Sequence, residues 1–333
     1  MNNDNELGCK IKFPYYVNQI LLLKSGNFII ASRRDIIYCN KNYKIKFKKE
    51  KVTNNNIQDM CLIDQNTFAV CSSGDIIILK ILENNFKIVK KYINPHGDHW
   101  VCSIIFSKNN ILISSSIYDD KIKIWDILNE SNQPIQVLNH DANGLLEWDE
   151  NIFISSGYSK TKIWNKIKDK LNYQLMNTFY GIDIYRNNGI KKYDDNSIIL
   201  CGLNYITYII NIKTMEATKK IFPEKQYDIY SILNLKKYLI LGGNNRNFSK
   251  YLDEINSLNN KKCKNEFLKK KKLRDPHELP EGFIHVYKKK RNNKFKLIKK
   301  INDAQKSTVE CLELINKDNV IFGKKIIPLN DII

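Results

Sequence analysis

The sequence predicts an all-β fold in which seven four-stranded antiparallel blades form a closed ring. Two observations support this. Short apolar runs, each opened by a polar turn residue, recur along the chain, and turn signals separate neighbouring runs at hairpin spacing. Four short strands in a period of about 40–45 residues are typical of one blade of a β-propeller. The repeated run opens at positions 27, 66, 110, 151, 196, 237 and 319, with Lys at 237 and Asn elsewhere.

The first four repeats follow each other without interruption, so each predicts one complete blade. Within a blade, we expect the first strand nearest the ring centre and the fourth at the rim. The predicted strands are 17–23, 27–32, 35–40 and 43–48 in blade 1, and 57–63, 67–72, 75–81 and 86–92 in blade 2. In blade 3 they are 101–106, 111–115, a third strand that follows an acidic turn and ends at 125–126, and 135–138. In blade 4 they are 144–148, 152–156, 161–165 and 175–179.

Blades 5 to 7 fit the repeat if blade 6 contains an insertion and blade 7 takes its fourth strand from the N-terminal part of the chain. Blade 5 is predicted at 189–193, 197–202, 206–212 and 217–221, and blade 6 at 229–235, 238–243, 283–288 and 294–300. Blade 7 has only 308–314, 320–323 and 325–330 before the sequence ends. The orphan strand 8–15 (GCKIKFPY) precedes blade 1, and its pairing with blade 7 is predicted to close the ring and remove both sheet edges.

The spacing between the last two repeats is about 40 residues too long for one blade. A lysine-rich insertion at 244–281, between the second and third strands of blade 6, accounts for the excess. We expect it to be flexible and to overhang one face of the ring. The rest of residues 1–333 is predicted to form a single domain.

The stretch 95–130 resembles one WD40 repeat. Three apolar runs are separated by turns, the third ends in Trp125-Asp126, and Asp119 precedes Trp125 by six residues. WD40 blades often contain a His–Ser/Thr–Asp–Trp hydrogen-bond relay, and the resemblance implies such a relay in blade 3. Its members are predicted to be His96, Ser115, Asp119 and Trp125, with His99 as the alternative histidine. This relay is structural, because a buried indole N–H and imidazole need partners.

Blade 4 keeps Trp164 but has no Asp in the corresponding turn, and the remaining blades lack the Trp. Blade 3 is therefore predicted to be the only blade with a full relay. The run 96–99 (HGDH) also resembles a metal-ligand cluster, but no second group of His, Cys or carboxylate completes a site. No metal and no cofactor is expected.

In WD40 propellers, the loops between blades and the loops between second and third strands share one face, which we call the top face. Five of the six arginines map to it, and several aromatic residues belong to the same loops. Arginine and aromatic residues dominate protein interfaces. The residues predicted to bind a partner are Arg33, Arg34, Trp100, Arg186 and Arg246.

The chain has 54 basic residues, only six of them arginine, and a net charge of +19. We interpret the lysine excess mainly as a compositional bias on solvated surfaces, while selected binding to nucleic acid or to a membrane surface is the alternative. The eight cysteines lack CxxC pairs and mostly fall in apolar runs, which indicates buried thiols in a reducing compartment. No apolar stretch is long enough to cross a membrane, so no membrane insertion is expected.

These features predict a non-catalytic scaffold whose top face binds a subunit of a complex or an acidic or phosphorylated peptide. Nucleophile elbows, phosphate-binding glycine loops and HExxH motifs are absent, so neither an enzyme nor a small-molecule substrate is expected. The alternative is an RNA-associated propeller, for example in ribosome assembly, that uses the basic insertion. A cytoplasmic location is favoured, with the nucleus as the alternative because 269–274 (KKKKLR) resembles an import tract.

Overall fold

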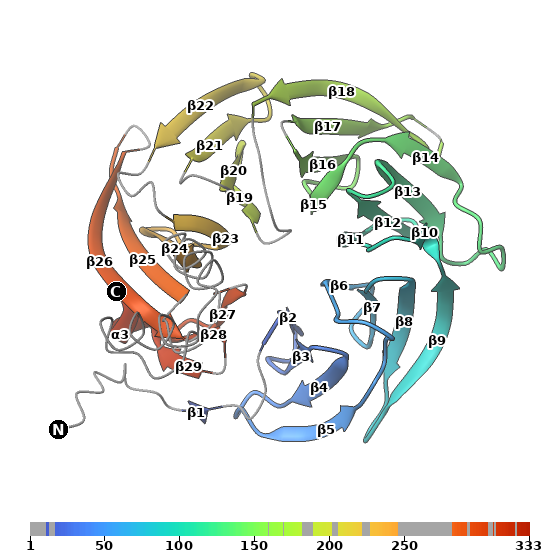
Figure 1. The fold of residues 1–333 in the computed structure, drawn as a ribbon, viewed down its shortest axis with the longest axis horizontal. Coiled ribbons are helices and arrows are strands. Elements are labelled where there is room, and N and C mark those ends of the chain that lie inside the picture. The colour runs from blue at the N-terminus through green and yellow to red at the C-terminus, as the bar shows by residue number, and fades with distance from the viewer. Residues whose placement is uncertain are drawn as a thin grey trace, which may run out of the picture.

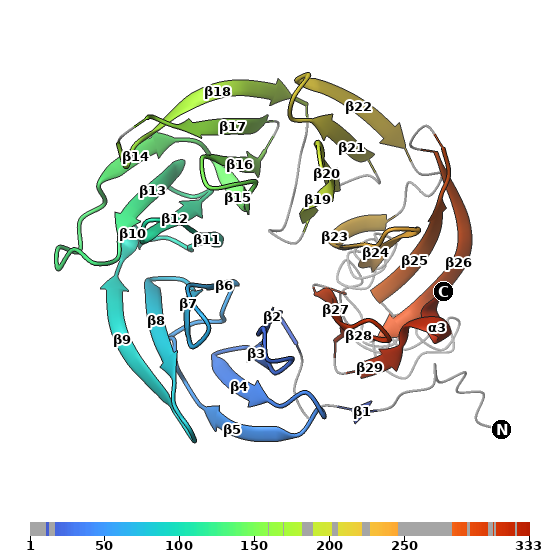
Figure 2. The same cartoon turned by 180° about the vertical axis from the view of Figure 1, so that it is seen from behind.

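The computed structural model forms a ring of seven four-stranded sheets, shown from its two sides in Figures 1 and 2. It describes residues 11–12, 17–158, 160–168, 170–181, 189–201, 206–221, 227–245, 282–291, 294–305, 309, 311–323 and 325–333. The strands pair in sequence order within each sheet, except in the seventh, where the first strand of the chain lies at the outer edge. The predicted all-β, seven-bladed propeller is therefore confirmed.

Blades 1 to 4 occupy consecutive positions around the ring, with the first strand of each nearest the centre (Figure 1). Their strands are β2 (Gln19–Leu22), β3 (Phe28–Ser32), β4 (Asp35–Cys39) and β5 (Ile45–Lys49) in blade 1, β6 (Asp59–Leu62), β7 (Thr67–Cys71), β8 (Asp75–Ile81) and β9 (Phe86–Ile93) in blade 2, β11 (Ser103–Ser107), β12 (Ile111–Ser116), β13 (Lys121–Asp126) and β14 (Gln136–Asn139) in blade 3, and β15 (Ala142–Glu147), β16 (Ile152–Gly157), β17 (Lys160–Lys166) and β18 (Tyr173–Tyr180) in blade 4. The short strand β10 (Pro95–Asp98) leads into blade 3.

Blades 5 to 7 complete the ring, and the short helix α3 (Leu329–Ile332) follows the last strand. Their strands are β19 (Ile190–Asp194), β20 (Ser197–Cys201), β21 (Ile206–Asn211) and β22 (Glu216–Ile221) in blade 5, β23 (Tyr227–Asn234), β24 (Tyr238–Asn245), β25 (Gly282–Lys289) and β26 (Phe295–Gln305) in blade 6, and β27 (Leu312–Asn316), β28 (Asn319–Phe322), β29 (Lys325–Pro328) and β1 (Ile11–Lys12) in blade 7.

The second strand of each blade explains why the repeat is visible in the sequence. Strands β3, β12, β20 and β28 are buried along their whole length, because a neighbouring blade covers each face of the sheet. Strands buried on both faces appear in sequence as continuous apolar runs.

The residue that opens each run also has a repeated role. A backbone N–H from the end of the third strand donates to its backbone carbonyl in four blades, at Asn66, Asn110, Asn151 and Asn196.

The chain termini meet in blade 7. Ile11 lies opposite Ile326 and Lys12 opposite Lys325 in an antiparallel pair of β1 with β29. The other residues of the predicted strand 8–15 lie outside the described part of the chain, so closure of the ring by the full strand remains a prediction. In blade 6, β24 continues to Asn245. The rest of the predicted insertion, 246–281, also lies outside the described residues.

The inner strands surround a cavity of about 280 Å³ at the centre of the ring. Its lining is mixed: aliphatic side chains occur together with four charged ones, which are Asp59, Glu147, Lys191 and Glu313. Lys191 Nζ of β19 lies 2.5 Å from Glu313 Oε1 of β27, so this ion pair joins blades 5 and 7 past the inner strand of blade 6. Burial lowers the pKa of Lys191, but the charge and hydrogen bond of Glu313 outweigh it and raise that pKa.

Candidate protein-binding face

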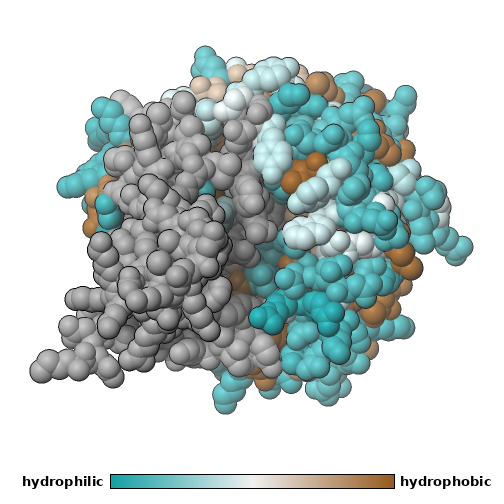
Figure 3. All heavy atoms as spheres, viewed as in Figure 1, coloured by the Kyte–Doolittle hydropathy of each residue, from teal (hydrophilic) through white to brown (hydrophobic). Residues whose placement is uncertain are grey.

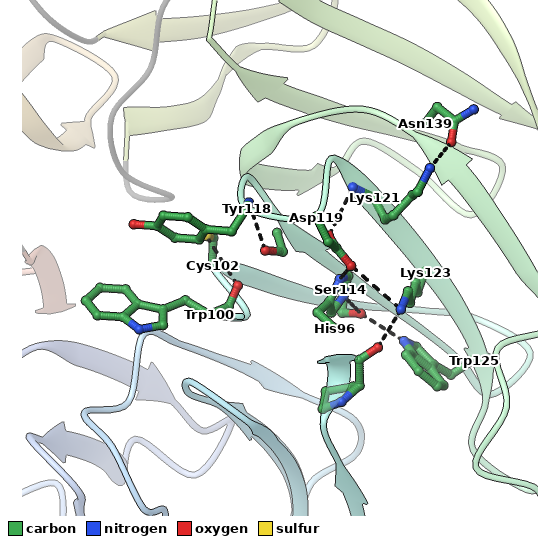
Figure 4. Close-up of polar contacts among 12 residues, drawn as sticks. His96, Trp100, Cys102, Ser114, Tyr118, Asp119, Lys121, Lys123, Trp125 and Asn139 are labelled. Carbon is green, nitrogen blue, oxygen red and sulfur yellow. Dashed lines mark hydrogen bonds and ion pairs between the residues drawn. The ribbon is translucent and has the colours of Figure 1, made fainter. Parts of the chain in front are cut away.

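A hydrogen-bond relay fixes the loops at the top of blade 3 (Figure 4). The indole N–H of Trp125 donates to Ser114 Oγ at 2.9 Å, and Ser114 Oγ lies 2.8 Å from His96 Nε2. His96 Nδ1 lies 2.9 Å from Asp119 Oδ2. One neutral tautomer satisfies every contact: the serine hydroxyl donates to Nε2, and Nδ1–H donates to the carboxylate. The loop that carries His96 is thereby tied to the turn that carries Asp119.

The serine of this relay is Ser114, so the prediction of Ser115 is wrong. Successive side chains of a strand point to opposite faces of the sheet. Trp125 lies opposite Leu112, and Ser114, two residues further along the strand, shares its face. Ser115 points to the other face, where its Oγ is buried without a hydrogen-bond partner among the described residues.

The relay is suited to a structural role and not to proton transfer. Burial lowers the pKa of His96, against the opposing influence of Asp119. Burial also raises the pKa of Asp119, but the hydrogen bond and charge of His96 outweigh it and hold that pKa below its usual value. His96 is 1% exposed and both ring nitrogens are occupied, so no substrate can reach a free nitrogen. The residues predicted as a structural relay are thus brought together, with one serine exchanged.

Blade 4 contains a shorter version of the relay, which the sequence analysis missed. Trp164 Nε1 donates to Ser155 Oγ at 2.7 Å, and Ser155 Oγ lies 2.6 Å from His140 Nδ1. The His140 ring has the opposite orientation to that of His96: its Nδ1 faces the serine, whereas in His96 the Nε2 does. The Nε2 of His140 lies 3.7 Å from Asp141 Oδ1. Two residues in the sequence could have indicated it: His140 in the loop before the blade and Trp164 in the third strand. The turn before the third strand has no Asp, so they do not match the four-residue His–Ser/Thr–Asp–Trp pattern.

His140 should make the fold sensitive to mild acid. Burial lowers the pKa of His140 to about 3, whereas a histidine in an unfolded chain titrates near 6.5. Between these values only the unfolded chain binds the proton. Stability present at neutral pH is therefore lost as the pH falls below about 6.5.

At pH 5 we expect a loss of about 2 kcal/mol in the free energy of unfolding from this site. Urea unfolding at pH 7 and pH 5 measures it. The variant His140→Gln should show a correspondingly smaller difference between the two pH values, with a residual difference due to His96. An unchanged pH dependence in the variant would exclude His140 as the source.

Three aromatic side chains form an exposed group on the top face above the blade 3 relay. Trp100 is 47% exposed and Tyr118 54% exposed, and their rings meet edge to face with centroids 6.0 Å apart. The ring of His99 stacks on Tyr118 at 6.3 Å. Trp100 is held by a β-bridge to Ser73, and the backbone N–H of Tyr118 donates to Ser116 Oγ. Figure 4 shows the two large rings side by side and apart from the buried relay. The group is ordered by its backbone although the rings face solvent.

The two arginines of the blade 1 turn have different environments. Arg33 is exposed and adopts a positive φ of 54°, which is uncommon outside glycine. Its N–H donates to Asn18 Oδ1, and its carbonyl accepts the N–H of Ile57, so the turn is held from both sides. Arg34 is half-buried and its Nη1 donates to the carbonyl of Asn54 at 3.2 Å. Arg33 is therefore free to reach a ligand, while Arg34 also supports the neighbouring loop.

The remaining predicted binding residues, Arg186 and Arg246, lie outside the described part of the chain. The structure therefore brings Arg33 and Arg34 together and places Trp100 in a separate loop of the top face. Within the described residues, no group of His, Cys, Asp or Glu is arranged to hold a metal ion, and no helix is long and apolar enough to cross a membrane. In the coloured part of the space-filling view, the face shows mainly hydrophilic side chains, with near-neutral residues toward the middle (Figure 3).

Comparison with known proteins adds evidence on the fold. No protein-family model and no curated protein matches the sequence. Among solved structures, the WD40 β-propeller domain of Doa1 is similar, with a TM-score of 0.61, 15% identity, and 95% of this chain and 92% of that chain covered. The WD40 repeats of RRP9 give a TM-score of 0.65 at 12% identity, with 94% of this chain and 88% of that chain covered. With the relay geometry of blade 3, these similarities show that the chain has the fold of a seven-bladed WD40-repeat β-propeller.

Proposed function

We propose that the protein is a non-catalytic scaffold whose top face binds a protein partner. The observation that carries this proposal is the exposed pair of Trp100 and Tyr118. Large rings at a solvent-exposed position supply contact area to a partner at low entropic cost, because they have few rotatable bonds. Here the backbone contacts and the relay beneath already fix the loops that carry them, so little order has to be gained on binding.

Arg33 supports an acidic or phosphorylated segment as the partner's contact. A guanidinium group binds carboxylate and phosphate through paired hydrogen bonds. The backbone around Arg33 is fixed by Asn18 and Ile57, while its side chain faces solvent. Arg186 and Arg246 are proposed to extend this basic site. The buried relay gives no support to an enzyme, and the proposal includes no small-molecule substrate. It favours the cytoplasm, with the nucleus as the alternative.

Replacing both Trp100 and Tyr118 with alanine is expected to weaken partner binding by roughly tenfold to a hundredfold. The partner is first identified by affinity purification of the intact protein and mass spectrometry, and its affinity is then measured by titration. Arg33→Ala should weaken binding mainly for a phosphorylated or acidic partner segment. Leu128→Ala is the control, since Leu128 is 72% exposed in a turn at the opposite end of blade 3. Equal affinity of the wild type and the double variant would refute the top-face proposal.

The alternative is an RNA-associated propeller. It is supported by the net charge of +19 and by the lysines on the outer strands β5, β9, β22 and β26. Titration of a labelled single-stranded RNA at increasing salt separates the two proposals. Binding to phosphates falls steeply with salt because counterions are released, whereas an aromatic and arginine protein interface changes modestly.

A further inference from the structure

The outer edge of blade 4 differs from the other long edges of the ring. Strands β5, β9, β22 and β26 all carry lysines, which protect exposed sheet edges against pairing with other chains. Strand β18 reads YQLMNTFY and has no charged residue over eight positions. The neighbouring outer strand β14 is also uncharged but only four residues long. Figures 1 and 2 both show β18 on the rim with no strand outside it.

Apolar side chains lie exposed along this edge. Leu175 is 50% exposed, Met176 51% and Tyr180 74%. The register of β17 and β18 shifts at Met176. Leu175 lies opposite Trp164 and Asn177 opposite Ile163, so Met176 has no partner in β17 and is the extra residue of a bulge. The bulge places two apolar side chains next to each other at the centre of the strand.

At the beginning of β18, a side-chain amide already pairs with the outward backbone groups of the edge, as the backbone of a neighbouring strand would. The side-chain amide of Gln136 donates from Nε2 to the carbonyl of Tyr173 at 2.8 Å. In return, the N–H of Tyr173 donates to Gln136 Oε1 at 2.7 Å. These are the donor and acceptor that the backbone of an added strand would supply. Gln136 occupies the outward N–H and C=O of Tyr173, which shows that this edge can bind an amide from outside its own sheet.

A basic pocket adjoins the same end of β18. It has a volume of about 390 Å³ and lies among the turns at the bottom of blades 3 and 4. Its walls include Lys166, Lys168, Lys170, Asn109, Asn151 and Leu171. None of the three ammonium groups makes a hydrogen bond or ion pair within the described residues. Glu150, whose pKa Lys166 helps to lower, is already paired with Lys108 at 2.8 Å. Three cations around one hollow, unpaired as far as the described residues go, favour an anionic group as its occupant.

We propose that the rim of blade 4 binds an extended segment of a partner protein that carries acidic side chains at one end. Apolar residues of this segment pack on Leu175 and Met176, and the acidic side chains enter the lysine pocket. A second copy of the chain does not fit this role, because both copies carry a net charge of +19 and Lys160 and Lys166 of β17 lie opposite the two ends of β18. This site is separate from the top face.

The experiment selects binding peptides from a random display library on the intact immobilised protein. The expected peptides combine alternating apolar residues with an acidic cluster at one end. Met176→Lys should reduce their affinity by about tenfold or more, because it restores the charge that protects the other edges. Val89→Lys is the matched control: Val89 is the bulge residue of the corresponding strand β9, is 57% exposed, and lies in a strand that already carries Lys87, Lys90 and Lys91. It should bind as the wild type does.

Two further variants complete the test. Combined replacement of Lys166, Lys168 and Lys170 by alanine should weaken binding of the acidic peptide but not of the same peptide with Gln at its acidic positions. The Trp100 and Tyr118 double variant should bind the peptide normally, so failure at the rim and failure at the top face are distinguishable. The proposal is overturned if no such peptide is selected or if Met176→Lys binds it undiminished. It is equally overturned if sedimentation shows a wild-type dimer that Met176→Lys dissociates, since the occupant would then be a second copy.

Discussion

Ser114→Ala is expected to lower the free energy of unfolding by about 2–6 kcal/mol, because it leaves two buried polar groups without partners. The hydroxyl of Ser114 accepts the indole N–H of Trp125 and lies 2.8 Å from His96 Nε2. All three side chains are buried, so water cannot simply replace the missing hydroxyl. An unsatisfied buried donor or acceptor costs about 1–3 kcal/mol, and here one small substitution creates one of each. Urea unfolding at neutral pH measures the loss.

The adjacent serine provides the control for this prediction. Ser115→Ala removes a hydroxyl that is equally buried but has no hydrogen-bond partner among the described residues. We expect its effect to lie within about 0.5 kcal/mol of zero, or to be slightly stabilising, because a polar atom leaves an apolar site. If the two variants are equally destabilised, the hydrogen bonds of Ser114 do not contribute as the geometry indicates.

Deletion of residues 1–16 should leave an aggregating or poorly folded chain. The deletion removes β1, and β29 then becomes an open sheet edge next to the start of blade 1. Ile326 and Ile327 of β29 are fully buried in the intact protein. An unpaired strand rich in apolar residues is a template for association with other chains. Size-exclusion chromatography and thermal unfolding detect the expected loss of monomer and of a cooperative transition.

A shorter deletion separates the strand from the residues that precede it. Removal of 1–7 leaves the whole predicted strand 8–15 in place, so the melting temperature should remain that of the full chain. Val17, whose N–H donates to the carbonyl of Gly323, is retained in both deletions. A 1–16 deletion that melts at the temperature of the intact protein would show that the ring does not depend on the N-terminal strand.

The architecture was predictable from the sequence because the burial pattern of a propeller blade is simple. The second strand is covered on both faces, so it remains apolar in every blade even where other positions vary. The polar residue before this run marks the turn. Together they gave the number and order of the blades without any contact information. Blade 3 was the most informative, because Asp119 and Trp125 restrict its turn as well as its strands.

Details of the candidate sites depended on information that the sequence does not contain. Ser114, Ser115 and Ser116 are chemically identical neighbours, and only the pairing of Leu112 with Trp125 shows which hydroxyl faces the indole. Arg33 and Arg34 are likewise adjacent, but a backbone carbonyl twenty residues away engages only the second. The lysine pocket beside β18 assembles turns of two blades, so no single segment reveals it.

The ion pair of Lys191 and Glu313 has a consequence for how this ring can change in evolution. It holds blade 5 to blade 7 directly, and blade 6 lies between them. Blade 6 is also the blade in which 36 residues separate the end of β24 from the start of β25. A blade whose two neighbours are fastened to each other contributes less to keeping the circle intact. Blade 6 is therefore a place where additional chain is tolerated with little effect on the contact between its two neighbours.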